Sequence, residues 1–241
     1  MFSRLLLLLA VIGFAAATIP SYIHVCGRRN PHFDECVNNS MTALRGNLRN
    51  GMPELDIPSI EPLKINEMKI IDEPQIKITA KDIKLNGLWT FHLNFLHLDL
   101  EKKELTADFA FDKITLDADF LLKLNILVPI QRKGVMVLKC NNAGAKIKAY
   151  YKLIKRDNEQ YVHFESIPIK LDIKDYTADF KTENLDSSLQ SAINDVLGKN
   201  HDDVLRTIQP HVEKAISKSC INLTNKIYDN FTYDELFPDR A

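Results

Sequence analysis

Two carboxylates in the stretch ITLDADFLLKLNILV, residues 114–128, have a spacing that could serve chemistry. Asp117 and Asp119 would share one face of a β-strand, and paired carboxylates are the acid and base of many glycosidases. However, every even position of this stretch is apolar, so the two aspartates lie opposite an apolar face. A solvated outer strand face explains the pair better than catalysis does.

The histidines do not form a metal site by their spacing. His92 and His97 are five residues apart, so on a regular strand they face opposite sides of the sheet. The sequence also contains no G-x-S-x-G nucleophile turn and no H-E-x-x-H zinc motif. We therefore expect no enzymatic activity, no bound metal and no cofactor.

The charges are balanced over the whole chain, with 31 Lys and Arg, 32 Asp and Glu, and a net charge of −1. No overall field would attract nucleic acid or an anionic membrane. Lys146, Lys148 and Lys152 share one strand face. We interpret them as a solvated face that pairs with Glu165 or Asp172, rather than as a binding patch.

The N-terminus has the pattern of a secretory signal peptide. Arg4 is followed by an apolar run over residues 5–17 that contains Ala15 and Ala17 at A-x-A spacing. A membrane anchor is the alternative, but the run is short for a bilayer and no charged stop-transfer flank follows it. We expect a signal peptide over residues 1–17 and one secreted domain over residues 18–241.

Secretion affects the interpretation of the four cysteines, because an even number in an oxidising compartment indicates disulfides. Cys26 and Cys36 would pin a short loop to the following helix, and Cys140 and Cys220 would then tie a strand to a C-terminal helix. Zinc is the alternative, which neither a C-x-x-C motif nor a nearby histidine pair supports. The chain also carries three N-glycosylation sequons, at Asn38, Asn222 and Asn230.

The spacing of apolar residues predicts where the chain is helical and where it is extended. A helical period predicts a helix over residues 32–49 that ends at Gly51. Three prolines in residues 51–63 predict an extended crossing segment. From about residue 64 to residue 181 apolar and polar residues alternate, which predicts long β-strands with one apolar face.

The apolar positions change parity twice within this region, at Asp112-Lys113 and again before Tyr176. A change of parity indicates a bulge or a sharp bend, so we expect the long strands to bend at these points.

Helical spacing returns after Asn184. One apolar stripe covers residues 185–196, and a second predicts a helix over residues 201–229, about 43 Å long, with a kink or an irregular turn at Pro210. Because the strands and this helix have similar lengths, the simplest assembly is an α+β fold: one curved antiparallel sheet wrapped along the long C-terminal helix.

The long apolar face indicates either a filled core or the wall of an elongated tunnel. Fifteen strand residues reach about 50 Å, well beyond an ordinary strand. Periodicity alone favours a core, whereas strand length favours a tunnel. The candidate wall residues are Phe91, Phe109, Phe111, Leu116, Phe120, Leu122, Tyr151 and Phe180. Trp89, the single tryptophan, could cap a tunnel mouth, although plain packing explains it better.

Several segments occur in a characteristic order between about residue 19 and residue 238. They are Ile19-Pro20-Ser21-Tyr22-Ile23 before Cys26 and Cys36, Gly51-x-Pro53-Glu54-Leu55 with Ile57-Pro58 and Glu61-Pro62-Leu63, Asn86-Gly87-Leu88, Leu127-Val128-Pro129, Asn184-Leu185, and Tyr233-Asp234-Glu235-Leu236-Phe237-Pro238. Together they resemble the signature segments of the insect takeout and haemolymph juvenile-hormone-binding protein family.

This resemblance implies a secreted carrier that binds juvenile hormone, a related terpenoid or a fatty acid in an apolar tunnel between the helix and the sheet. It implies Cys26–Cys36 as the common disulfide of the family. Cys140–Cys220 resembles an extra bridge of the hormone-binding branch, whereas the C-terminal tail resembles takeout.

The resemblance also implies haemolymph or another extracellular fluid as the location, and an association with circadian output, feeding and chemosensation. It identifies no receptor. An extracellular interaction protein with a filled interior is the alternative function, and a secreted hydrolase is a third, which lacks a nucleophile motif.

Overall fold

The computed structural model describes residues 19–125, 129–183 and 201–241. The expected signal peptide, the apolar stripe over residues 185–196 and the Leu127-Val128 strand end lie outside the described residues. Among those that are described, none of the helices combines the length and the apolar composition needed to cross a bilayer.

Two short helices follow the N-terminal loop: α1 (Phe33–Ala43) and α2 (Arg45–Asn50). The sequence predicted one helix here, but the chain changes direction at Leu44, which ends α1 and precedes α2. Gly51 ends α2 with a φ of 86°, a conformation that favours glycine, as the sequence predicted. The expected extended segment that follows contains a short turn, η1 (Pro53–Leu55).

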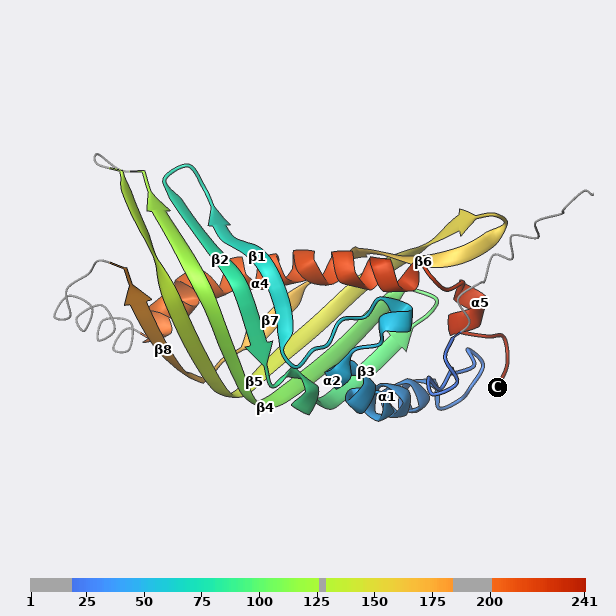
Figure 1. Ribbon diagram of the computed structural model, residues 1–241. Coiled ribbons are helices and arrows are strands. Elements are labelled where there is room, and N and C mark those ends of the chain that lie inside the picture. The colour runs from blue at the N-terminus through green and yellow to red at the C-terminus, as the bar shows by residue number, and fades with distance from the viewer. Residues whose placement is uncertain (1–18, 126–128, 184–200) are drawn as a thin grey trace, which may run out of the picture.

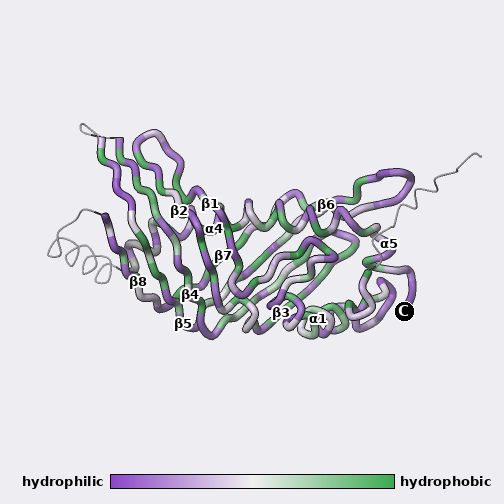
Figure 2. Tube along the Cα trace, viewed as in Figure 1, coloured by the Kyte–Doolittle hydropathy of each residue, from purple (hydrophilic) through white to green (hydrophobic). Residues whose placement is uncertain are grey.

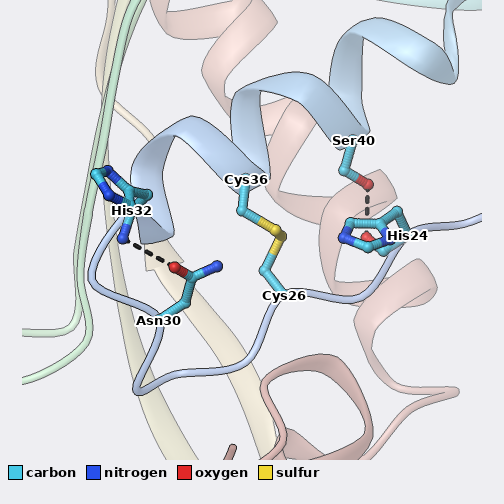
Figure 3. The surroundings of a disulfide bond; sticks show 6 residues. All are labelled: His24, Cys26, Asn30, His32, Cys36 and Ser40. Atoms are coloured by element: carbon cyan, nitrogen blue, oxygen red, sulfur yellow. Dashed lines mark hydrogen bonds between the residues drawn. A yellow bond between two sulfur atoms is a disulfide. The ribbon is translucent and has the colours of Figure 1, made fainter. Parts of the chain in front are cut away.

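The Cys26–Cys36 disulfide is confirmed, and it fastens the N-terminal loop to α1 (Figure 3). One turn further along α1, the Ser40 hydroxyl donates a hydrogen bond of 2.7 Å to the carbonyl oxygen of His24. The loop is therefore attached to α1 at two successive turns.

One antiparallel sheet forms the body of the protein. Its strands are β1 (Leu63–Asp72), β2 (Ile76–Asn86), β3 (His92–Asp99), β4 (Glu104–Leu124), β5 (Ile130–Arg156), β6 (Glu159–Ser166), β7 (Ile169–Asp172) and β8 (Asp175–Thr182). The strand order is β1-β2-β4-β5-β6, while β3 also pairs with β4, and β7 and β8 pair with β5. Figure 1 shows β4 and β5 running through the whole sheet and rising steeply at the end where β1 and β2 lie.

The sheet has a crease that crosses three strands, defined here by Asp112, Asn142 and residues 173–174. Asp112 of β4 stands opposite Asn142 of β5, and Asn142 has a φ of 51°. The break between β7 and β8, at residues 173–174, faces the same point of β5 by the register of both strands. The two parity changes in the sequence therefore mark one structural feature.

The long C-terminal helix, α4 (His201–Tyr228), packs against β6, β7 and β1, and Figure 1 shows it crossing the sheet. The helix continues through Pro210, so the irregular turn expected there is wrong. Pro210 is exposed, and therefore water can bind the Arg206 carbonyl that the proline leaves without a partner. A short helix, α5 (Tyr233–Leu236), follows and begins with a capping box between Thr232 and Glu235.

The expected second disulfide is wrong, because Cys140 and Cys220 are free thiols. Cys220 lies on α4 between Glu213 and Asn225, which bind β7 and β6 beside residues 145–151 of β5. Cys140 precedes this part of β5 by five residues, about 16 Å along the strand, whereas disulfide-bonded Cα atoms are less than about 7 Å apart. Burial raises the pKa of both thiols, which disfavours the reactive thiolate.

Within the described part of the chain, buried side chains form three clusters. The largest joins the sheet to α4, α1 and α5, and its most buried members are Leu98, Ala149, Tyr151, Val162, Phe164, Ile167 and Ile169. A second lies between the N-terminal segment and the end of α4, at Met52, Leu55 and Phe231. The third lies between β2 and β4, at Ala80, Ile83 and Ala118.

Candidate functional site

Apolar side chains line one face of the long strands on both sides of the crease, as the alternation predicted. Figure 2 shows hydrophobic and hydrophilic residues alternating along β4 and β5 over their whole length. Most of the predicted wall residues are half-buried: Phe109, Phe111, Leu116, Phe120, Leu122 and Phe180. Partly accessible apolar side chains in a continuous face are typical of a surface that receives a ligand or partner.

Three phenylalanines form a row on the β3 side of the crease. Phe91 follows the turn η2 (Leu88–Thr90) and is only 5% exposed. Its ring meets Phe109 edge to face with 5.7 Å between centroids, and Phe109 stacks on Phe111 at 6.4 Å. Both distances lie in the range of favourable aromatic contacts, so the row is a pre-formed aromatic surface.

Gly87 places η2, and with it Phe91, against β4 at the crease. Its φ is 95°, and a Cβ atom on this residue would lie 2.0 Å from the carbonyl oxygen of Lys113. Its amide also donates a hydrogen bond of 2.8 Å to the carboxylate of Glu61. Only glycine fits this close approach of two backbones.

A second aromatic contact lies beyond the crease. Phe120 of β4 and Phe180 of β8 meet edge to face with 5.8 Å between centroids. Leu116 packs against the cluster of Ala80, Ile83 and Ala118, and Leu122 pairs with Ile78 of β2. The structure thus divides seven of the predicted wall residues into two groups, one on each side of the crease.

Tyr151 belongs to the packed core beneath α4 rather than to either group. It is 5% exposed and its ring lies 5.7 Å from that of Phe164, which in turn contacts Tyr228 at 5.1 Å. Its hydroxyl is buried without a hydrogen-bond partner, and burial raises its pKa. This hydroxyl is a polar atom that a ligand oxygen could satisfy.

Sequence reasoning did not single out Arg45, which the structure places beside the row of phenylalanines. Its guanidinium lies 5.0 Å from the centroid of Phe91, and its Nε is buried without a hydrogen-bond partner. One turn later Arg49 lies 4.3 Å over the ring of Trp89. A basic residue on a short helix is ordinarily solvated, so its type alone gives no signal. The one signal in the sequence is that the two arginines are four residues apart, which places them on the same face of a helix.

The polar residues that could have done chemistry lie close to residues of opposite charge on neighbouring strands. Asp117 pairs in register with Lys84 of β2, and Asp119 with Lys81. The expected pairing of Lys152 with Glu165 is confirmed at 2.8 Å. These charged pairs have the spacing of ordinary cross-strand contacts.

The two histidines interact with different carboxylates. His97 Nδ1 lies 2.7 Å from Asp34 of α1, whereas His92 Nε2 lies 3.7 Å from Asp112. Where the structure describes the chain, the one close group of potential metal ligands is His24, Cys26 and Cys36, and its thiols are joined in the disulfide.

Two hollows occur on the polar surface, away from the aromatic row. One of about 360 Å³ lies between α1 and β3, lined by Pro31, His32, Phe33, Asp34, Glu35, His97 and Leu98. The other, about 280 Å³, is lined by Gln131, Arg132, Lys133 and Glu183. The lining of the second hollow is mainly charged, and that of the first mixes two carboxylates and two histidines with three apolar residues. Both therefore suit a hydrophobic molecule less well than the wall residues do.

Comparison with known proteins decides the family. The sequence profile described as Haemolymph juvenile hormone binding protein (JHBP) matches residues 5–238. The chain belongs to this family. The resemblance inferred from the sequence segments is therefore confirmed.

Two relatives carry the name circadian clock-controlled protein daywake. The chain is 24% identical to that of Drosophila melanogaster over 204 residues, which cover 78% of each protein. It is also 24% identical to that of Drosophila yakuba over 202 residues, covering 78% of this chain and 77% of that one.

A solved member of the family confirms the predicted fold. The crystal structure of Epiphyas postvittana Takeout 1 matches 89% of this chain and 99% of its own, with a TM-score of 0.71 and 21% identity. The shared architecture is a curled antiparallel sheet with a long C-terminal helix, as the lengths of the strands and the helix had predicted.

Proposed function

We propose that this protein is a secreted, non-enzymatic carrier that binds one hydrophobic small molecule in an elongated apolar tunnel. Juvenile hormone, a related terpenoid or a fatty acid are the ligand classes in view. The observation that carries the proposal is the pair of half-buried aromatic groups on the face of β4 and β8, at Phe109, Phe111, Phe120 and Phe180. Membership of a family described as binding juvenile hormone supports it.

Desolvation supplies the binding free energy in this proposal. Burial of about 300 Å² of apolar ligand surface would give about 7 kcal/mol before ordering costs are subtracted. A free energy of about 7 kcal/mol corresponds to a dissociation constant of about 10 μM, which the ordering costs then weaken. The wall fixes the apolar body of the ligand, and buried polar atoms such as the Tyr151 hydroxyl would orient its oxygen groups.

Secretion follows in this proposal from cleavage of the signal peptide over residues 1–17, and the family description names haemolymph proteins. By analogy with the names of the daywake relatives, we extend the proposal to ligand control in circadian regulation. The resemblance drawn from the sequence segments adds feeding regulation. The physical basis would be control of the free ligand concentration.

A fluorescent titration tests the carrier proposal. A neutral dye such as N-phenyl-1-naphthylamine should bind the wild-type protein, and Phe109→Ala and Phe120→Ala should each weaken binding about tenfold, because each removes a large apolar contact. Phe95→Ala is the matched control, since Phe95 is 52% exposed and lies outside the predicted wall.

Equal dye affinity in the wall variants and in Phe95→Ala would contradict the carrier proposal, as would a wild-type protein that takes up no dye. The interior would then be filled, which is the expectation for an extracellular interaction protein. Circular dichroism of each variant checks that the fold is retained.

A further inference from the structure

The row of three phenylalanines on the β3 side of the crease ends at a cation. Phe111 stacks on Phe109, Phe109 meets Phe91, and the Arg45 guanidinium lies 5.0 Å from the centroid of Phe91. Arg45 is the first residue of α2, and α2 packs directly against η2, the turn that precedes Phe91. The packing of α2 on η2 therefore places the backbone of Arg45 close to Phe91, within reach of its side chain.

Arg45 is half-buried, and one of its N–H groups lacks the partner that a buried donor ordinarily has. Its Nε is buried without a hydrogen-bond partner, and no carboxylate among the described residues forms an ion pair with it. A buried donor without an acceptor is unfavourable, whereas a guanidinium and a carboxylate form short, charge-assisted and often bidentate hydrogen bonds. An acidic oxygen group delivered by a ligand would complete this site.

Arg49, on the same helix, provides a comparison for Arg45. It also stacks on an aromatic ring, with 4.3 Å between its guanidinium and the Trp89 centroid. However, Arg49 is exposed, so water can bind its N–H groups. The two arginines differ chiefly in access to water, which makes Arg49 a matched control for Arg45.

We propose that Arg45 binds the anionic head of the carried ligand, and that the preferred ligands are therefore long-chain carboxylic acids rather than neutral esters. This inference rests on the proposed carrier function and names its ligand class. The apolar chain of the acid would run along Phe91, Phe109 and Phe111, with its carboxylate at the guanidinium. Because the net charge of the chain is −1, the preference for an anion would be local to Arg45.

Displacement of the neutral dye by palmitate and by methyl palmitate at neutral pH tests this inference. Wild-type protein should bind the acid at least about tenfold more tightly than the ester, because only the ionised carboxylate can form an ion pair with the guanidinium through two parallel hydrogen bonds. Arg45→Met, which keeps an apolar stem, should lose this preference because it weakens acid binding far more than ester binding. Arg49→Met should keep the preference, and Arg45→Lys should retain part of it.

Two results would overturn the inference while leaving the carrier function intact: equal affinity of the wild-type protein for acid and ester, or an unchanged preference in Arg45→Met. The first needs no variant, so it remains informative if Arg45→Met fails to fold. Failure of the wild-type protein to bind the dye and both lipids would instead overturn the carrier function, and the inference with it.

Discussion

The Tyr151 hydroxyl is a single polar atom whose role in stability can be tested by removing it. It is buried in the cluster beneath α4 without a hydrogen-bond partner, so its removal leaves no other group unsatisfied. Tyr151→Phe should therefore leave the free energy of unfolding unchanged or raise it by about 1 kcal/mol. Urea denaturation measures this difference.

A loss of about 1 kcal/mol or more in Tyr151→Phe would show that the hydroxyl has a partner in the folded protein. The same variant should weaken binding of oxygen-containing ligands more than binding of a plain hydrocarbon, because only the former can use the hydroxyl. Equal effects on both ligand types would assign Tyr151 a packing role alone.

At this scale the sequence predicts which residues face the interior but not which residues meet. Alternation selects Phe109, Phe111 and Phe120, because neighbouring side chains of a strand point to opposite faces. Arg45 reaches Phe91 only because η2 folds back onto α2, a contact between segments that are far apart in the sequence. No local pattern contains that information.

Alanine substitutions of two glycines in neighbouring elements should have opposite effects on the stability of the protein. Gly87→Ala should destabilise the protein by about 2 kcal/mol or more, because its φ of 95° and the 2.0 Å approach to Lys113 exclude a side chain. Gly46→Ala is the control. Gly46 lies within α2, and a methyl group added there would have no atom within 4 Å, so alanine should stabilise the protein by about 1 kcal/mol.

Thermal unfolding of both glycine variants measures these effects. A Gly87→Ala protein as stable as the wild type would show that η2 can move away from β4, and so would remove the reason given for the position of Phe91.

Glu213 fastens α4 to β7 and makes their contact sensitive to acid. Only 5% exposed, it accepts hydrogen bonds of 2.9 Å each from Lys170, the Leu171 amide and Gln209. Burial by itself raises the pKa of Glu213, but these hydrogen bonds outweigh burial and hold the pKa below its ordinary value of 4.5.

Because the folded protein binds this proton more weakly than the unfolded chain does, Glu213 stabilises the fold fully above about pH 4.5 and loses that contribution as the pH falls through the lowered pKa. Glu213→Gln keeps an acceptor for Leu171, so it should fold, with a cost of about 1 kcal/mol at neutral pH. Its unfolding free energy should fall less steeply than that of the wild type between about pH 6 and pH 3.

Denaturant unfolding over that pH range provides the comparison. Glu67→Gln is the control, since Glu67 forms only an exposed pair with Lys81 and such pairs contribute little. Parallel pH profiles for the wild type and Glu213→Gln would contradict the role assigned to this carboxylate.

Strands and helices were more predictable than the contacts between them. The parity changes identified the crease because a one-residue irregularity reverses the faces of a strand. The Cys140–Cys220 bridge was wrong because the position of α4 along β5 depends on Glu213 and Asn225, each of which binds a backbone group of β7 or β6. Because every residue type has the same backbone groups, such contacts cannot be predicted from the sequence.

On the scale of the whole molecule, the lengths of the strands and of the C-terminal helix predicted the architecture. Strands of 21 and 27 residues, together with a helix of 28 residues, are too long for separate small domains and must wrap around one another. The match to Takeout 1 over 89% of the chain confirms that arrangement. Occupancy of the interior does not follow from lengths, because lining and core residues share one apolar pattern.

Native mass spectrometry of the purified protein tests the carrier function most directly. We predict a species heavier than the lipid-free protein by the mass of one lipid, which organic extraction removes and which added palmitate restores. A single mass without lipid, unchanged by extraction and by incubation with palmitate, would contradict the proposal.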